Sequence, residues 1–191
     1  LKAQQFDGGY KITAVKDAAG KPLEHVVVQT MMRIIPPKPL KPGGKITFSV
    51  DWNFNIIDAT KIRARRGYEF FKEDKNHLYA LAQWFPRMCA YTDVTGWQNK
   101  QYLGTGEFAL EFGDYLVRIT APADHVVAST GELQNPEAVL PKTQRDRLAK
   151  ARDAKKPVFI VSLDEAKANE KEKAKDKKTW IYKADNVRDF A

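Results

Sequence analysis

The sequence predicts an all-β fold, an antiparallel two-sheet β-sandwich with a helical excursion near residues 137–177. Three observations predict it: apolar and polar residues alternate in the first 130 residues, Pro and Gly separate those stretches, and the periodicity changes after Asn135-Pro136. Of the 191 residues, 43% are hydrophobic, enough for a folded core. We expect a single domain over 1–191, with 137–178 as a charged helical insertion.

The clearest predicted strand covers residues 45–54. Its apolar side chains fall on one face at every second position, namely Ile46, Phe48, Val50, Trp52 and Phe54. Such alternation is typical of an antiparallel sheet with one solvated face. The preceding segment 36–44 contains four prolines and two glycines. Because proline cannot donate to a ladder, we expect an exposed connector there.

Further strands follow from the same pattern. Residues 10–16 and 23–35 are predicted to pair across a turn at 17–22, and 114–121 alternates clearly. A short strand is expected at 125–129. A strand through Trp84 should end at Pro86, because proline restricts the residue before it to extended conformations.

The C-terminal part is predicted to mix helices and strands. Apolar residues among charges indicate a helix over 137–154, and 157–161 is typical of a short buried strand. Ser162 and Glu165 fit a capping box that begins a polar helix to about residue 177. A last strand is expected at 179–184, with Trp180 and Tyr182 on one face.

The positive charge is concentrated in one segment. The chain carries a net charge of +8, and residues 141–178 hold 13 Lys and Arg against 7 Asp and Glu. The two signs alternate within each turn, which is typical of a solvated helix. A basic nucleic-acid binder is the competing interpretation. We disfavour it because the segment has no interleaved aromatic residues for base stacking.

The sequence offers little catalytic chemistry. Its lone cysteine, Cys89, excludes an internal disulfide, and the neighbours of Cys89 include no histidine that would activate a thiolate. His25, His77 and His125 fall in predicted strands, outside any His-Glu-x-x-His pair. No apolar run is long enough to cross a membrane. We therefore predict no catalytic residue, metal ligand or cofactor in this chain.

The region from Asn76 to Phe112 is the richest in aromatic and polar residues. Large aromatic residues in connecting segments either plug the end of a sandwich or face a partner. If they face a partner, the segment from Trp84 to Trp97 would serve an autonomous binding module for protein or glycan.

Several motifs here resemble the N-terminal β-domain of zinc aminopeptidases of the gluzincin type, the family of aminopeptidase N and leukotriene hydrolase. They occur in the order Ala82-Gln-Trp-Phe-Pro-Arg-Met88, Tyr91-Thr-Asp-Val-Thr-Gly-Trp97, Gly106-Glu-Phe-Ala-Leu-Glu-Phe-Gly-Asp-Tyr115, Val117-Arg-Ile-Thr-Ala-Pro-Ala-Asp124, Gly131-Glu-Leu-Gln-Asn-Pro136 and Thr179-Trp-Ile-Tyr-Lys-Ala-Asp-Asn-Val-Arg-Asp-Phe-Ala191. The resemblance covers roughly residues 45–191.

The resemblance implies that the parent protein is a multidomain exopeptidase, often exported from bacteria. Zinc and the catalytic residues would belong to a thermolysin-like domain of the same parent chain, and this chain would be a truncated, non-catalytic part of it. In the family, a Gln or Glu of this domain helps receive the free amino group of the peptide substrate. The resemblance assigns that role to Gln83, or to the region of Asn76 and His77 upstream. The alternative is that Gln83 is an ordinary strand residue.

Overall fold

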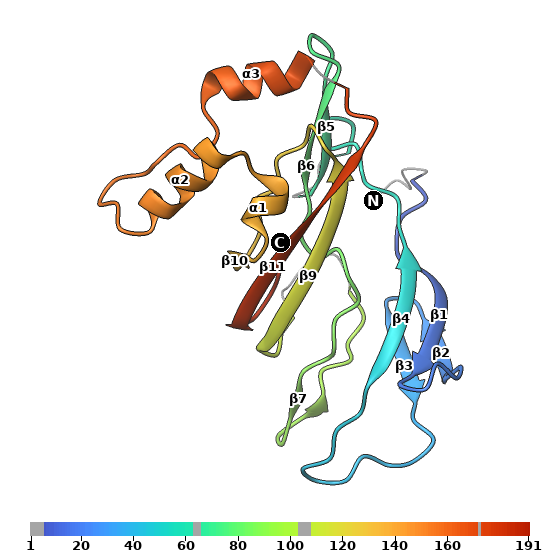
Figure 1. Ribbon diagram of the computed structural model, residues 1–191. Coiled ribbons are helices and arrows are strands. Elements are labelled where there is room, and N and C mark those ends of the chain that lie inside the picture. The colour runs from blue at the N-terminus through green and yellow to red at the C-terminus, as the bar shows by residue number, and fades with distance from the viewer. Residues whose placement is uncertain (1–5, 63–65, 103–107, 172) are drawn as a thin grey trace. The chain divides into compact units, whose positions relative to one another are not determined.

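The computed structural model describes residues 6–62, 66–102, 108–171 and 173–191. The chain divides into two compact units. One, here called the N-terminal unit, comprises residues 1–67 and 84–111, and the other, the C-terminal unit, comprises residues 68–83 and 112–191. Figure 1 shows small antiparallel sheets in both units, and the described helices all belong to the C-terminal unit.

Three strand pairs make up the described sheet structure of the N-terminal unit. Strand β1 (Lys11–Asp17) is antiparallel to β4 (Phe48–Asn53), with Val15 opposite Val50. The second pair joins β2 (Glu24–Val28) to β3 (Met31–Ile35). The third is a short hairpin of β7 (Tyr91–Thr92) and β8 (Gly96–Trp97). The predicted strand at 45–54 is therefore present in its central part, with the expected alternation of half-buried and exposed residues.

The predicted pairing of residues 10–16 with 23–35 is wrong. Residues 24–35 fold on themselves at Gln29, whose φ of 53° makes the turn, and β1 pairs with β4 instead. A single bridge between Lys16 and Pro22 and the hydrogen bond from Leu23 N to Val15 O lie at the turn between the two segments. Because Pro22 has no N–H, it cannot extend a ladder from that bridge.

The C-terminal unit is built on a three-stranded sheet with the order β10-β11-β9. Strand β9 (Gly113–Pro122) and β11 (Lys177–Val187) form a long antiparallel pair, and β10 (Glu132–Leu133) pairs with the other edge of β11. A separate hairpin, which lies in this unit from Tyr68 onward, consists of β5 (Gly67–Phe71) and β6 (Asn76–Ala80). The predicted strands at 114–121 and 179–184 are thus confirmed, each with longer bounds.

The core of the C-terminal unit lies on one face of β11. Trp180, Tyr182 and Ala184 are buried at alternate positions, which confirms the predicted shared face of Trp180 and Tyr182. The Tyr182 hydroxyl donates a hydrogen bond to the Val127 carbonyl at 2.7 Å. Phe190 is fully buried and lies 5.8 Å from Tyr115, measured between ring centroids.

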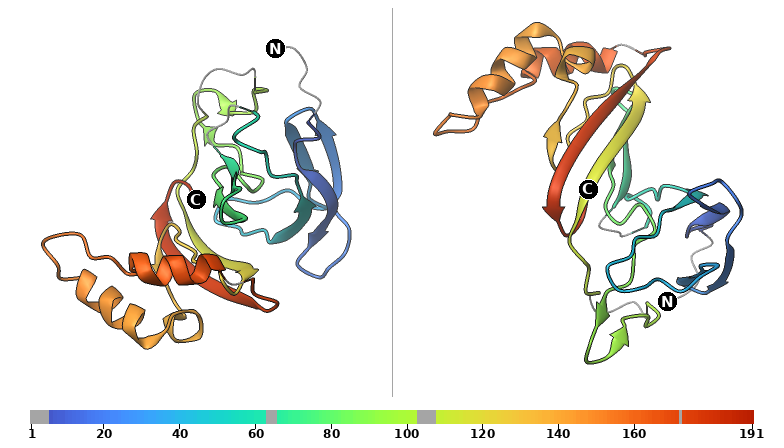
Figure 2. Two further views of the ribbon diagram at one scale, coloured as in Figure 1. Left: turned by 90° about the horizontal axis from the view of Figure 1, so that it is seen from above. Right: turned by 60° about the horizontal axis from the view of Figure 1, so that its bottom comes forward.

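The three described helices are α1 (Pro136–Val139), α2 (Lys142–Ala151) and α3 (Leu163–Lys171). In both views of Figure 2 they lie on the same side of the β9–β11 pair. The single helix predicted over 137–154 is broken at Leu140-Pro141, since proline lacks the N–H that would continue α1. The predicted extension of α3 to residue 177 is also wrong, because β11 already begins at Lys177.

Three predicted strands are absent from the described residues. The segment 125–129 forms no strand, because its polar groups bond elsewhere: Val127 O accepts from Tyr182, and Ser129 Oγ donates to Ala191 O. The segment 157–161 is likewise irregular, and Phe159 is 86% exposed. No strand passes through Trp84, because β6 ends at Ala80 and residues 81–86 are irregular.

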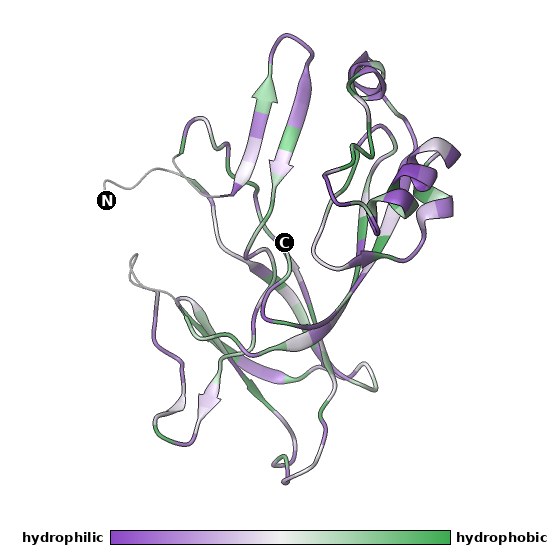
Figure 3. Cartoon of the chain, turned by 90° about the vertical axis from the view of Figure 1, so that its left-hand side faces the viewer, coloured by the Kyte–Doolittle hydropathy of each residue, from purple (hydrophilic) through white to green (hydrophobic). Residues whose placement is uncertain are grey.

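The hydropathy pattern of the elements agrees with a mainly β fold of small antiparallel sheets. Figure 3 shows hydrophobic and hydrophilic residues alternating along the long strands and a mostly hydrophilic helical segment. The predicted helical excursion near residues 137–177 is confirmed, with its helices between Pro136 and Lys171.

Candidate functional site

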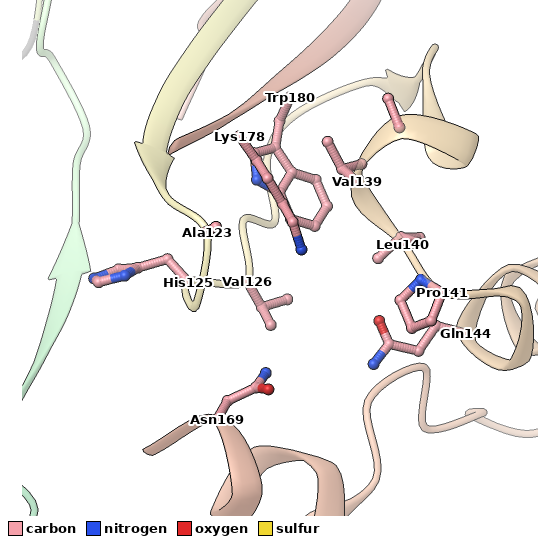
Figure 4. A pocket seen from close by; sticks show the side chains of 11 residues that line it. Ala123, His125, Val126, Val139, Leu140, Pro141, Gln144, Asn169, Lys178 and Trp180 are labelled. Carbon is pink, nitrogen blue, oxygen red and sulfur yellow. The ribbon is translucent and has the colours of Figure 1, made fainter. Parts of the chain in front are cut away.

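A cavity of about 380 Å³ lies within the C-terminal unit (Figure 4). Residues from five segments line it: the loop after β9, α1 with the residues that follow it, α2, α3 and β11. The lining residues are Ala123, His125, Val126, Ala138, Val139, Leu140, Pro141, Gln144, Asn169, Lys178 and Trp180. A site drawn from so many segments depends on how each helix is held against the sheet.

Asn135 holds the start of α1 beside β11. Its side-chain amide donates to Thr179 O at 2.9 Å, and its side-chain oxygen accepts from Ile181 N at 2.9 Å. These two bonds satisfy backbone groups of β11 beyond the end of its short pairing with β10, as a longer neighbouring strand would. Pro136 follows at the first helical position, where a missing N–H costs nothing. The wall formed by Val139 and Leu140 is fixed in this way.

Arg147 on α2 holds α3 in place. Its Nη1 donates to Ile160 O at 3.0 Å and to Glu165 Oε2 at 2.5 Å. Glu165 Oε2 also accepts from Ser162 N at 2.6 Å, and Ser162 Oγ accepts from Glu165 N at 3.3 Å, so the predicted capping box is confirmed. The Ser162 amide, together with the Arg147 guanidinium, lowers the pKa of the Glu165 carboxyl. The beginning of α3, and with it the position of Asn169, is therefore fixed.

Four polar side chains in the cavity make no hydrogen bond or ion pair within the described part of the chain. The Nε1 of Trp180 is buried without a partner, and Gln144 is only 6% exposed. Asn169 and Lys178 are half-buried. In Figure 4 the carboxamides of Gln144 and Asn169 point into the cavity from two sides, and the Lys178 ammonium enters it past the Trp180 indole.

His125 lines the same cavity, but its ring turns away from the four polar side chains toward β6 (Figure 4). Its Nδ1 lies 2.8 Å from Asp124 Oδ1, and its ring centroid lies 6.1 Å from that of Tyr79. Burial, the largest effect on Asp124, raises its pKa. The amide N–H of Ala174, 2.8 Å from Oδ2, and the His125 ring offset that effect, so the pKa of Asp124 lies below its usual value. Both oxygens of the Asp124 carboxylate thus already have a hydrogen-bond partner, His125 Nδ1 at Oδ1 and Ala174 N at Oδ2.

His77, assigned to substrate binding by the resemblance, lies on β6 among aromatic rings. Its ring centroid is 4.8 Å from Phe70, 5.6 Å from Tyr68 and 5.8 Å from Tyr79. His77, Phe70 and Tyr79 are exposed. Gln83 lies beyond the end of β6, exposed and with a φ of 50°, in the left-handed region. The alternative interpretation of Gln83 as an ordinary strand residue is therefore wrong, since β6 ends at Ala80.

Neither a metal centre nor a reactive thiol is built from the described residues. Among residues 6–62, 66–102, 108–171 and 173–191, no group of three or more His, Cys, Asp or Glu could hold a metal ion. The resemblance assigns the zinc and its ligands to a neighbouring domain of the parent enzyme, so we derive no zinc-dependent step in this chain. Burial raises the pKa of the Cys89 thiol, which disfavours the reactive thiolate. No described helix is long and apolar enough to span a membrane.

The cavity was not found by sequence reasoning. The strand pattern predicts that Trp180 and Tyr182 share a face, but the burial of that face and the unpartnered nitrogen of Trp180 depend on tertiary packing. Gln144 and Asn169 fall in charged helical stretches that are typical of solvated surfaces. Gln144 is the only buried residue of α2, and its burial follows from where the helix packs, which the sequence pattern does not give.

The cavity offers a ligand several hydrogen-bonding groups: the two carboxamides, the Lys178 ammonium and the Trp180 indole N–H. No family model matches the sequence, and neither the curated proteins nor the solved structures contain a match.

Proposed function

We propose that this chain is a non-catalytic β-domain of a zinc-dependent aminopeptidase, with the two-sheet sandwich architecture of that family, and that it forms one wall of the peptide-substrate cleft. The parent enzyme would hydrolyse the N-terminal residue of peptides, and the zinc and its ligands would belong to a neighbouring thermolysin-like domain. The family-like motifs, which follow one another along the sequence between residues 82 and 191, support this proposal.

The observation that carries the proposal is the exposure of large apolar side chains within those motifs. Met88, Tyr91 and Trp97, all in the N-terminal unit, are each between 54% and 59% exposed. Large apolar surface on a stable monomer usually marks a surface that another protein or domain covers. A domain that packs against the catalytic part of a peptidase would cover such side chains.

The proposal is tested by the purified chain and its gene. We expect the chain alone to release no amino acid from alanine or leucine p-nitroanilide and to retain no stoichiometric zinc by mass spectrometry. We expect the reading frame that contains it to encode His-Glu-x-x-His downstream, and the longer protein to cleave both substrates. Peptide cleavage by the isolated chain, or a reading frame without the zinc motif, would refute the proposal.

A specific observation also favours the autonomous binding module. Tyr91 and Trp97 form an exposed edge-to-face pair at the β7–β8 hairpin, with centroids 5.2 Å apart. Exposed aromatic pairs of this kind bind sugar rings or peptide side chains. Binding of the isolated chain to a glycan array, abolished by Trp97→Ala and retained by Trp52→Phe, would favour this function over the peptidase domain.

A further inference from the structure

We propose that the cavity of the C-terminal unit binds a small organic anion, a carboxylate or phosphate carried on an apolar or aromatic body. The site belongs to the C-terminal unit alone and does not depend on the peptidase proposal. Its proposed contacts are Gln144, Asn169, Lys178 and Trp180.

The first argument is the convergence of polar groups without partners. Buried polar groups in proteins are nearly always hydrogen-bonded, and each exception calls for an explanation. Here the Trp180 Nε1 is buried without a hydrogen-bond partner among the described residues, and it shares the cavity with Gln144, a residue that is only 6% exposed and whose side chain makes no hydrogen bond to them. The side chains of Asn169 and Lys178, which are half-buried, line the same space and make no hydrogen bond to the described residues. A bound molecule with several acceptors would satisfy all four.

The second argument is the balance of donors and charge. The indole N–H and the Lys178 ammonium can only donate, whereas each carboxamide can donate or accept. No carboxylate is among the lining residues. The nearby Asp124 is already engaged by Ala174 N and His125 Nδ1. An uncompensated ammonium beside surplus N–H donors therefore selects an acceptor-rich anion.

The third argument is the apolar remainder of the cavity. Val126, Val139, Leu140 and the Trp180 indole supply hydrocarbon and aromatic surface opposite the polar groups. The volume of about 380 Å³ lies at the lower end of the range of small-molecule sites. A bare ion would leave most of this volume unfilled, so we infer an anionic group attached to a ring or a short chain.

Titration of the ¹⁵N-labelled full chain with phenylacetate tests the proposal. Trp180→Phe identifies the Trp180 indole signal, and nuclear Overhauser contacts to Val139 identify it if that variant fails to fold. We expect phenylacetate to shift this signal saturably and to bind about tenfold more tightly than 2-phenylethanol or acetate. Phenyl phosphate in a parallel titration distinguishes a phosphate site from a carboxylate site.

Matched variants show which side chains contribute to the affinity for phenylacetate. We expect Lys178→Met to weaken phenylacetate binding about tenfold and Gln144→Leu to weaken it severalfold. Lys177→Met is the control, because Lys177 lies next to Lys178 on the opposite face of β11 and does not line the cavity. The control removes the same charge and should leave the affinity unchanged.

Three outcomes would overturn the proposal. One is the absence of any shift of the Trp180 signal in the wild-type chain with either anion at 10 mM, on the order of the weakest useful affinity, which would mean that only water fills the cavity. Another is equal binding of phenylacetate and 2-phenylethanol, which would make the cavity merely apolar. The third is an equal effect of Lys177→Met and Lys178→Met, which would assign the anion to the general positive field.

Discussion

Ser162 and Glu165 cap the N-terminus of α3 reciprocally: Ser162 N donates to Glu165 Oε2 at 2.6 Å, and Glu165 N donates to Ser162 Oγ at 3.3 Å. The same Glu165 oxygen accepts from Arg147 Nη1 at 2.5 Å. One carboxylate thus closes the helix end and joins α3 to α2. Because Asn169 lies one turn further along α3, the geometry of the cavity depends on this cap.

Replacing Ser162 should weaken both the cap and the unit that contains it. We expect Ser162→Ala to lower the free energy of unfolding of the C-terminal unit by about 1 kcal/mol, because the N–H of Glu165 loses its acceptor. Ser162→Thr keeps a hydroxyl at this position and should retain most of the stability. Urea denaturation followed by circular dichroism measures the difference. Equal stability of the Ala and wild-type chains would show that the Ser162 hydroxyl contributes nothing to the cap.

Gly131 cannot accept a side chain without moving β11. Its φ is 88°, and an added Cβ would lie 2.3 Å from Lys183 O. We expect Gly131→Ala to destabilise the C-terminal unit by roughly 2 kcal/mol or more, from backbone strain and this clash. Gly113→Ala is the matched control, because its Cβ would only reach ordinary contact with Tyr115 at 4.0 Å. Thermal unfolding should separate the two variants clearly, and identical melting temperatures would contradict this account.

Local sequence patterns predicted the parts of this fold that depend on local physics. The capping box at Ser162 and Glu165 needs only neighbouring residues, and it is present. The shared buried face of Trp180 and Tyr182 follows from the period of a strand. Both features would survive in any arrangement of the surrounding elements.

The errors arose where distant segments compete for the same backbone groups. β1 pairs with β4, whose residues lie more than thirty positions away, although residues 23–35 offered a nearer partner. When two candidate partner strands both alternate apolar and polar residues, the sequence does not show which pairing is more stable. In the same way, Val127 was expected in a strand, but the buried Tyr182 hydroxyl binds its carbonyl.

The candidate site was invisible for a related reason. Trp180, Gln144 and Asn169 come from a strand and two helices, and no motif spacing connects them. Their importance lies in missing hydrogen bonds, which only the packed structure can show.

Asp58 should titrate far below an ordinary carboxyl. The Thr60 hydroxyl at 2.6 Å and the Lys61 ammonium at 3.0 Å lower the pKa of Asp58 to about 2. Because the folded-state pKa is depressed, the stability that Asp58 contributes is present above its unfolded pKa of 3.8 and is lost as the pH falls toward 2. We expect Thr60→Val to raise the pKa measured by carboxyl NMR titration. An unchanged pKa in that variant would mean that the hydroxyl has no effect.

Gln83 is the sharpest test of the proposed place beside a substrate cleft. Gln83 is exposed, lies three residues after the end of β6 at Ala80, and has a φ of 50° in the left-handed region. A carboxamide oxygen can accept a hydrogen bond from the ammonium of a peptide N-terminus. In the longer peptidase we expect Gln83→Ala to raise KM about tenfold with little change in kcat, since a charged hydrogen bond to the bound substrate is lost in ground and transition states alike.

The same kinetics separate Gln83 from His77, the other residue that the resemblance places near the substrate. His77 packs against Phe70 and Tyr79, so we expect His77→Ala to alter KM less than Gln83→Ala does. Gln134→Ala removes another exposed glutamine of the C-terminal unit and serves as the control. A larger effect of His77→Ala would transfer the amino-group contact to β6. Unchanged KM in both variants would remove Gln83 and His77, and with them this edge of the C-terminal unit, from the proposed substrate cleft.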